Sequence, residues 1–351
     1  MSGGSRSQRT RLLACDEAGI AAAAAILRSG GLVAFPTETV YGLGADALDA
    51  RAVRAIFEAK GRPADDPLIV HLAAPDQLER VARGNAVSAQ LGEHFWPGPL
   101  TLILPKRPSV PAEVTAGLQT VAVRVPAHRV ARALLLAVGQ PLAAPSANLF
   151  GRPSPTRPAH VLDDLDGRID AVLDGGPTTV GVESTIVDVS STPTRLLRPG
   201  GLAVREIESV LGERLVQPSP SESNAGPQSS PGRLPVHYSP RTPLTLIIGP
   251  ADAARTRLRA EAEAAVAARQ SVGVVALEDD RSLFSSSVHV EVVGSWSEPA
   301  ASAARLFEAI RALDAAGLDV LLARELADPC LGLGQALADR LRRAAQRIIE
   351  A

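Results

Sequence analysis

Two cationic side chains, Lys60 and Arg62, close a predicted helix and precede His71, which ends a predicted strand. Cations at a helix C-terminus interact favourably with the helix dipole, which is the simplest interpretation of the pair. Yet only two of the 36 basic residues are Lys, namely Lys60 and Lys106. An ammonium is a compact charge and a guanidinium a two-pronged donor, so a Lys-x-Arg pair suits a polyphosphate. A single His at a strand end is more often structural than catalytic.

Polar side chains gather in further segments, each beside a predicted strand. These segments are residues 36–44, 120–126, 144–156, 181–188 and 197–200. Polar turns, helix caps and Asx turns are their structural interpretations. Arg124 interrupts an apolar strand, and a buried charge there needs a partner, either an internal carboxylate or a ligand carboxylate. Since ligands of α/β sheets bind at strand ends, the segments together predict a cationic, hydroxyl-rich crevice for an anionic ligand.

Several familiar catalytic patterns are absent from the sequence. It contains no GxxxxGK[ST] loop, no GxSxG, no HExxH and no GxGxxG. The two cysteines, Cys15 and Cys330, lie far apart and indicate neither a zinc site nor a disulfide framework. We therefore expect no metal-ligating residues, and a nucleotide would be held by scattered Lys, Arg, Ser and Asn side chains.

The elements that must position these groups alternate in type. Strands are predicted at 32–35, 68–72, 100–104, 121–125, 142–144, 171–173, 185–189 and 195–197, and helices at 18–27, 50–60 and 129–138. Asp16 is the expected N-cap of the first helix. Because several later strands follow one another without helices, the pattern predicts an α/β fold with a mixed sheet.

A second unit follows a linker. Residues 217–235 hold five Pro, five Ser and two Gly among 19 residues, a composition that cannot bury a core. Beyond it, strands at 244–248, 272–277, 288–293 and 320–323 alternate with helices at 252–269, 299–315 and 334–349. This order predicts a smaller, Rossmann-like parallel α/β domain. The first 11 residues are Ser/Gly/Arg-rich and are predicted to be frayed.

Composition narrows the function classes. Hydrophobic residues make up 46% and charged residues 21% of 351, with a net charge of −2, which excludes global disorder and a polyanion-binding surface over the whole chain. The apolar run 18–27 follows Asp16 and Glu17, where a signal peptide would carry positive charge, and no 18-residue apolar stretch occurs. We expect a cytoplasmic protein without a membrane segment.

Six motifs in order closely resemble the YrdC-domain threonylcarbamoyl-AMP synthases, in their long two-domain form. They are PTETVYGLG, KGRPADDPLIVH, TVAVRVP, APSAN, ESTIVD and LLRPG, with SPGRLPVHYSP in the linker. The resemblance implies a YrdC-like catalytic domain with a twisted mixed sheet at 12–210, after the N-terminus at 1–11 that composition predicts to be disordered. It further implies a linker acting as a lid at 211–241 and a Rossmann-like domain at 242–351.

The resemblance also implies a reaction and a site. L-Threonine, bicarbonate and ATP, with Mg²⁺, would give threonylcarbamoyl-AMP and diphosphate, and the product would pass to the transferase machinery that makes N6-threonylcarbamoyladenosine in tRNA. A weak contact with tRNA itself is left open. The implied ATP contacts are Lys60 and Arg62 (also the catalytic pair), Asp66, Thr120, Ser146, Asn148, Ser154, Arg198 and Tyr238. The implied threonine contacts are Thr37, His71, Arg124 for the carboxylate, the backbone of Ala144, and Ser184.

The sequence departs from the family pattern at two places. Asp66 stands where an Asn is usual; near a triphosphate its carboxylate would either repel or help hold Mg²⁺. The linker also lacks a second aromatic residue before His237, so lid closure would depend on Tyr238.

Two rival interpretations remain. A non-enzymatic module could bind tRNA or double-stranded RNA through phosphates, although the net charge and the scarcity of aromatic residues disfavour it. A carbamoyl-adenylate enzyme like the hydrogenase maturation proteins would need acylphosphatase and zinc-finger segments, which are missing.

Overall fold

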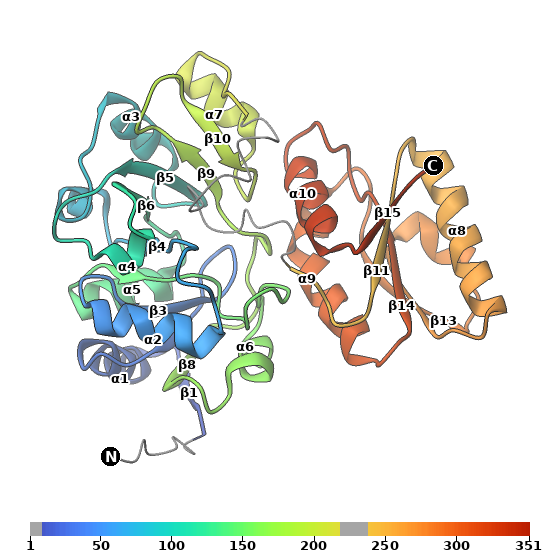
Figure 1. The fold of residues 1–351 in the computed structure, drawn as a ribbon, viewed down its shortest axis with the longest axis horizontal. Coiled ribbons are helices and arrows are strands. Elements are labelled where there is room, and N and C mark those ends of the chain that lie inside the picture. Colours follow the sequence, from blue (N-terminus) through green and yellow to red (C-terminus); the bar gives the residue numbers. More distant parts are fainter. Residues whose placement is uncertain (1–8, 218–237) are drawn as a thin grey trace.

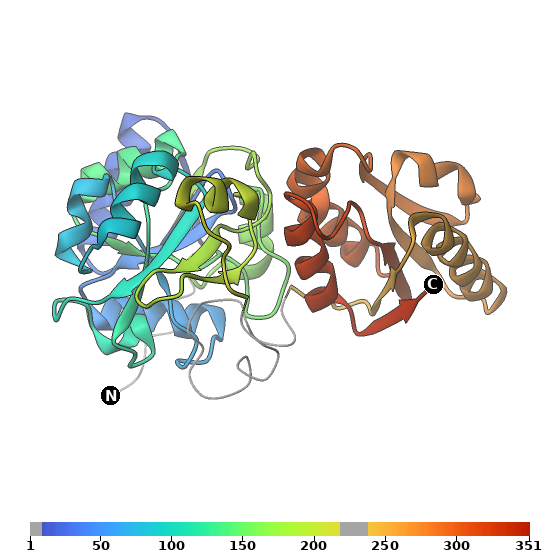
Figure 2. The same ribbon diagram turned by 90° about the horizontal axis from the view of Figure 1, so that it is seen from above.

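The computed structural model describes residues 9–217 and 238–351, which form two α/β units side by side (Figures 1 and 2). Within these residues no helix combines the length and the apolar character needed to cross a membrane. Most of the predicted linker, including the motif around His237, lies outside the described residues; Tyr238 lies within them.

Residues 9–217 form a ten-stranded sheet in the order β1-β8-β2-β3-β7-β4-β6-β5-β9-β10. Its strands are β1 (Arg11–Ala14), β2 (Val33–Phe35), β3 (Gly42–Asp46), β4 (Ile69–His71), β5 (Leu100–Pro105), β6 (Thr120–Arg124), β7 (Leu142–Ala143), β8 (Ala171–Asp174), β9 (Thr185–Asp188) and β10 (Arg195–Arg198). The sheet contains parallel pairs, such as β4 with β6, and antiparallel pairs, such as β5 with β6, so the predicted mixed sheet is confirmed.

Local signals explain the helices that flank this sheet. They are α1 (Glu17–Arg28), α2 (Ala50–Lys60), η1 (Pro75–Arg80), α3 (Ala86–Phe95), α4 (Ala112–Thr115), α5 (Arg129–Val138), α6 (Pro158–Leu165) and α7 (Val204–Leu211). Asp16 caps α1 by accepting a hydrogen bond from the Gly19 amide at 2.8 Å, as predicted. Gly61 ends α2 with a φ of 62°, a left-handed conformation that glycine adopts without strain. This turn sends the chain from Lys60 back toward the sheet.

Residues 238–351 carry five strands in the order β13-β12-β14-β11-β15, all parallel, which confirms the predicted Rossmann-like sheet. The elements are β11 (Leu244–Ile248), α8 (Ala251–Ala267), β12 (Val272–Leu277), η3 (Glu278–Leu283), β13 (Val288–Gly294), α9 (Pro299–Ala315), β14 (Val320–Arg324), α10 (Gly334–Ala344) and β15 (Arg347–Glu350). Apolar residues of α8 cover one face, whereas those of α9 and α10 cover the other.

Two local predictions are wrong. The helix expected at 334–349 ends at Ala344, and Arg347–Glu350 form β15, which pairs with β11. The β-branched pair Ile348-Ile349 suits a strand, and pairing along β11 outweighs the helical pattern before it. The prediction that residues 1–11 are frayed is also wrong for the last two of them. Arg11 pairs with Ala171, and the Thr10 hydroxyl donates to the Ile169 carbonyl at 3.0 Å. The strand β3 was not predicted.

Helices α9 and α10 form the side of the second unit that faces the first (Figure 1). Arg311 on α9 donates to Asp164 at 2.7 Å, and Arg340 on α10 donates to Glu183 at 2.6 Å. Gly181 lies so close to α9 that a Cβ there would meet the Ala303 carbonyl at 2.3 Å. The two units therefore meet through buried ion pairs and a direct backbone approach.

Candidate active site

The site begins where β4 and β6 end. These strands are parallel, and His71 and Arg124 are register partners at their carboxyl ends. Side chains two residues apart share a face of a strand, so Ile69 lies on the face of His71, and Ala122 and Thr120 lie on the face of Arg124. Both ends therefore present a charged or polar group above an apolar stretch of the same sheet face.

An apolar patch occupies that stretch. It consists of Ile69, Ile103, Ala122, Ile186 and Leu197, which pack together separately from the main core. They come from neighbouring strands, β4, β6, β5, β9 and β10. The sheet face thus has a polar end at His71 and Arg124 and an apolar region beside it.

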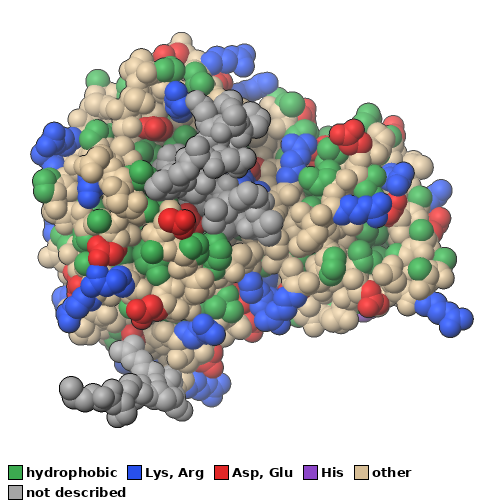
Figure 3. Space-filling model, in the orientation of Figure 1, with side chains coloured by type: hydrophobic (Ala, Val, Ile, Leu, Met, Phe, Trp, Pro, Cys, Tyr) green, Lys and Arg blue, Asp and Glu red, His purple; other side chains and the backbone are tan. Residues whose placement is uncertain are grey.

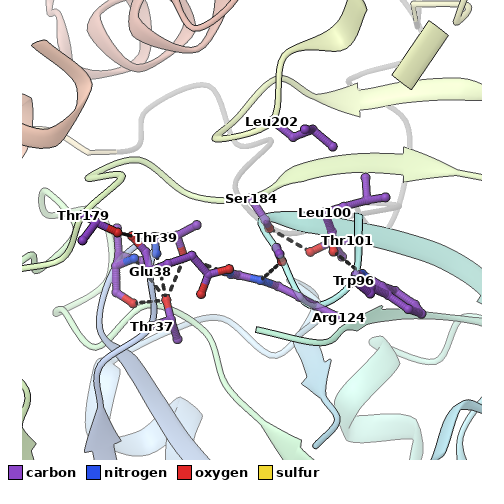
Figure 4. A network of polar contacts seen from close by, with 12 residues as sticks. Thr37, Glu38, Thr39, Trp96, Leu100, Thr101, Arg124, Thr179, Ser184 and Leu202 are labelled. Carbon is purple, nitrogen blue, oxygen red and sulfur yellow. Dashed lines mark hydrogen bonds and ion pairs between the residues drawn. The ribbon is translucent and has the colours of Figure 1, made fainter. Parts of the chain in front are cut away.

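Arg124 is buried and lies in a network that fixes its guanidinium (Figure 4). It donates to Glu38 Oε1 at 2.6 Å, to Thr39 Oγ1 at 2.9 Å and to the Gly98 carbonyl at 3.2 Å. Burial alone would raise the pKa of Glu38, but the positive charge of Arg124 outweighs burial and holds that pKa below its usual value. The sequence left two possible partners for Arg124, an internal carboxylate or a ligand carboxylate, and the structure shows the internal one, Glu38.

Ser184 stands directly before β9 and is drawn beside this network in Figure 4. Its hydroxyl lies 2.8 Å from Thr101 Oγ1 on β5, and Arg198 donates to its carbonyl at 3.1 Å and to its hydroxyl at 3.3 Å. Arg198, at the end of β10, is therefore oriented by the segment that carries Ser184.

The Thr37 side chain organises the turn after β2. Its hydroxyl donates to the Val40 carbonyl at 2.6 Å and lies 2.8 Å from Thr39 Oγ1 (Figure 4). The amides of Thr39 and Val40 point back to the same oxygen, at 3.2 and 3.3 Å. Thr37 thus lines the site and also sets the position of Thr39, which holds Arg124.

His71 is neutral in this site. Burial, followed by the nearby charge of Arg124, lowers its pKa to about 3. Nδ1 lies 3.3 Å from the Ile69 carbonyl, which can only accept, so Nδ1 carries the proton and Nε2 keeps its lone pair. His71 can therefore accept a hydrogen bond from a bound molecule through Nε2.

Lys60 is buried at 2% exposure and lies behind the loop that follows β7. Its ammonium donates to the Ser146 carbonyl at 2.6 Å and to the Asn148 carbonyl. Burial, and then repulsion from Arg62, lower its pKa well below the usual value. The side chain thus joins α2 to the 144–148 loop and concentrates positive charge beneath it.

Arg62 and Asp66 form a buried ion pair, with Nη2 2.9 Å from Oδ2. Arg62 also donates to the carbonyls of Asp66 and Pro67. Burial raises the pKa of Asp66, and the charges of Arg62 and Lys60 offset only part of that effect. Asp66 is therefore the counter-ion of Arg62 in this structure.

Most of the residues singled out in the sequence converge on one cavity. Those that line it are Thr37, Arg62, His71, Arg124, Ala144, Ser146, Ser184, Arg198 and Tyr238. Three others contact residues that line it: Lys60 contacts Ser146, Asp66 contacts Arg62, and Ser154 contacts Glu183. Asn148 lies in the same loop as Ser146. Thr120 begins β6, four residues before Arg124, and lies apart from the cavity.

Sequence reasoning missed two carboxylates of the site, Glu38 and Glu183. Glu38 directly follows Thr37 in the motif PTETVYGLG, and Glu183 directly precedes Ser184 in the motif ESTIVD. Glu183 lines the cavity and accepts hydrogen bonds from the Ser154 hydroxyl and from Arg340. Arg340 had no signal in the sequence, because it is one of many arginines outside the motifs.

The arrangement suits an anionic ligand with an apolar part. Arg62 and Arg198 bring positive charge to the cavity, Lys60 contacts the loop of Ser146, and Ile69 brings part of the apolar patch. Arg124 and His71 supply a donor and an acceptor. No group of three or more His, Cys, Asp or Glu side chains that could hold a metal occurs within residues 9–217 and 238–351.

Comparison with known proteins gives two family-model matches. Residues 25–200 match the Sua5/YciO/YrdC family, described as "Telomere recombination", and residues 202–346 match "Threonylcarbamoyl-AMP synthase, C-terminal domain". The two matches together span both units of the fold.

Full-length relatives give the same picture. The chain is 45% identical to the threonylcarbamoyl-AMP synthase of Pyrococcus abyssi, over 95% of this chain and 96% of that protein. It is 44% identical to the threonylcarbamoyl-AMP synthase of Bacillus subtilis, over 95% and 94%. The crystal structure of P. abyssi Sua5 complexed with L-threonine superposes with a TM-score of 0.90, at 44% identity, over 97% of this chain and 100% of that one.

Proposed function

The chain belongs to the threonylcarbamoyl-AMP synthase family, and on that premise we propose that its cavity joins L-threonine, bicarbonate and ATP into threonylcarbamoyl-AMP and diphosphate. The observation that carries the proposal is the set of groups that line one cavity at the strand ends. Arg124 and His71, which can bind a carboxylate, line the same cavity as the cationic side chains Arg62 and Arg198 and as Ile69 of the apolar patch.

The polar end suits the amino acid. Arg124 can donate to the threonine carboxylate while Glu38 and Thr39 hold its guanidinium in place. The Nε2 lone pair of His71 can accept from the threonine hydroxyl, and Ser184 and the Ala144 backbone offer further polar contacts. The P. abyssi relative has been solved with L-threonine, which supports a threonine site here.

The cationic middle suits the triphosphate. Arg62, Arg198, Ser146 and Asn148 would contact phosphate oxygens, and Lys60 would place its charge beneath the same loop. The adenine ring would pack on the apolar patch near Thr120, with Ser154 and Tyr238 at the nucleotide end. The ATP contacts are those that the family resemblance implies, except that Asp66 acts here as the counter-ion of Arg62 and that the place of the adenine ring is added.

The chemistry needs little from the protein beyond positioning. Bicarbonate yields carbon dioxide and hydroxide, the threonine amine forms a bond to that carbon dioxide to give a carbamate, and the proton that the amine loses combines with the hydroxide as water. A carbamate oxygen then attacks the α-phosphorus, the bond from that phosphorus to the bridging oxygen breaks, and diphosphate leaves with that oxygen. Orientation of the two reactants and stabilisation of the negative charge by Lys60, Arg62 and Arg198 would supply most of the rate enhancement.

Mg²⁺ is proposed only as the companion of ATP. Asp66 is the carboxylate beside Arg62, but it is already the ion-pair partner of that guanidinium. The described residues therefore do not fit a metal site of the protein's own, and the metal would be held by phosphate oxygens and water. We also propose that the adenylate passes to a tRNA-modifying transferase, which would use it as an activated acyl donor.

An RNA-binding module is less well supported. Positive and negative side chains are interspersed over both units on the face in Figure 3, outside the grey atoms, rather than gathered in a basic stripe. A phosphate-binding surface for RNA would need such a stripe.

Diphosphate release from ATP tests the proposal. We expect release to require both L-threonine and bicarbonate and to fall by at least about a hundredfold with valine, which has the shape of threonine without the hydroxyl. Serine is the matched control, since it keeps the hydroxyl and lacks the methyl group. Release that ignores bicarbonate or treats valine like threonine would refute the proposed reaction, and RNA binding without release would favour the module.

A further inference from the structure

Arg340 is a residue of the second unit that reaches the cavity of the first. It lies on α10 and has no exposed surface. Its guanidinium donates to Glu183 Oε2 at 2.6 Å and to the Pro199 carbonyl at 3.1 Å, and it lies 5.2 Å from the centre of the Tyr238 ring. One side chain thus contacts three segments around the nucleotide end of the cavity.

Glu183 transmits this contact to the cavity. One of its carboxylate oxygens accepts from Arg340 and the other from the Ser154 hydroxyl, and its backbone carbonyl accepts from the Gly201 amide at 2.8 Å. Burial raises its pKa, but the charges of Arg340 and Arg198 outweigh burial and keep that pKa below the usual value. A charged Glu183 fixes where the Ser154 hydroxyl points, and the residue after it is Ser184.

Tyr238 is held by the same helix pair. Its ring lies between Arg340 of α10 and Phe307 of α9, whose ring centre is 5.4 Å away. Its φ is 65°, a left-handed conformation that costs a non-glycine residue on the order of 1 kcal/mol or more. The packing of the ring against α9 and α10 offsets that cost and keeps Tyr238 at the cavity.

We propose that Arg340 is a positioning residue of the nucleotide site, which holds Glu183 and Tyr238 in place so that the second unit completes the ATP-binding end of the cavity. The proposal rests on the proposed function. Removing Arg340 would take away the ion-pair partner of the buried Glu183 carboxylate and leave only the more general field of Arg198, and a buried carboxylate that loses its partner protonates or moves. Ser154 and Tyr238 would then lose their orientation.

Arg311 provides a matched control. It is also a buried arginine of the second unit, on α9, and it donates to the buried Asp164 and to the Pro153 carbonyl. Neither Asp164 nor Pro153 lines the cavity. If Arg340 only joins the two units, Arg340→Met and Arg311→Met should behave alike.

The test compares R340M, R340K and R311M in the full chain, through steady-state diphosphate release and the thermal unfolding midpoint without ligand. We expect R340M to raise the KM for ATP by about tenfold or more, and R340K to raise it by less. R311M should change this KM by less than about threefold, even if its thermal unfolding midpoint falls as far as that of R340M. Equal KM values for ATP in R340M and R311M would overturn the proposal. If R340M does not fold, an R340K variant with the wild-type KM would overturn it.

A double-mutant cycle checks the route through Glu183. Because Arg340 acts through this carboxylate, the double variant E183Q/R340M should raise the KM for ATP by much less than the product of the two single fold-increases. A fold-increase equal to that product would contradict the proposal. The proposed reaction and the proposed role of Arg340 can be refuted independently of each other. A wild-type chain without threonine-dependent release refutes the proposed reaction, and calorimetric ATP affinities of the same variants still test Arg340.

Discussion

The guanidinium of Arg124 lies 2.6 Å from a carboxylate oxygen of Glu38, and both side chains are buried. The residue best placed to bind a substrate carboxylate is therefore already neutralised by a carboxylate of the protein. An incoming amino acid would share Arg124 with Glu38 rather than meet a bare charge. Such sharing favours a ligand that offers more than its carboxylate, such as the hydroxyl and amine of threonine.

Arg124→Lys should mainly weaken threonine binding. The ammonium of Lys cannot donate to Glu38, Thr39 and a substrate carboxylate in the planar arrangement of a guanidinium. We expect the KM for L-threonine to rise by about tenfold or more, while the KM for ATP changes by less than about threefold. Steady-state diphosphate release with each substrate varied gives both values. An unchanged KM for threonine would show that Arg124 serves only as the partner of Glu38.

Lys60→Met should lower turnover strongly. The variant keeps much of the side-chain volume but removes the charge beneath the 144–148 loop. It also leaves the partly buried carbonyl of Ser146 and the buried carbonyl of Asn148 without their donor. We expect kcat to fall by at least about a hundredfold, and the free energy of unfolding to fall by about 1–3 kcal/mol. Single-turnover diphosphate release and urea unfolding measure the two effects. Near-wild-type release would exclude Lys60 from the phosphate site.

Asp66→Asn should release Arg62 from its counter-ion without altering the demand for metal. The amide keeps the shape of the carboxylate but gives up the charge that pairs with Arg62 at 2.9 Å. We expect the KM for ATP to fall severalfold, because the triphosphate no longer competes with Asp66. The Mg²⁺ concentration for half-maximal release should stay within about twofold of wild type. A large increase in that concentration would instead make Asp66 a metal ligand.

The sheet edge that carries the site could be predicted from the sequence because it depends on strand order and side-chain alternation. His71 and Arg124 each end an apolar strand, and parallel strands bring their carboxyl ends together. The α/β class and the parallel second sheet follow from the same local patterns. The roles of the individual residues stay predictions.

The partners of the buried charges could not be predicted, because they are distant in the sequence. Glu38 is 86 residues from Arg124, and Arg340 is 157 residues from Glu183. Local patterns show that a buried charge needs a partner but not which carboxylate provides it. The direction of Lys60 was equally hidden, since a Lys that ends a helix can point to solvent, to a ligand or, as here, to two carbonyls. At the C-terminus, pairing with β11 decided between helix and strand, and that contact also lies about 100 residues away.

His71 should make the folded state less stable in acid. Its pKa is lowered from 6.5 to about 3 on folding, so between these values the unfolded chain binds the proton and the folded chain does not. Stability is therefore full above about pH 6.5 and decreases as the pH falls toward 3, by up to about 1.4 kcal/mol per pH unit from this residue. His160, whose pKa is lowered to about 4, adds to the same slope. Urea unfolding of the wild type and of His71→Gln between pH 4 and 8 measures the contribution. We expect a shallower slope in the variant, while a slope identical to that of the wild type would mean that His71 takes up a proton in the folded state.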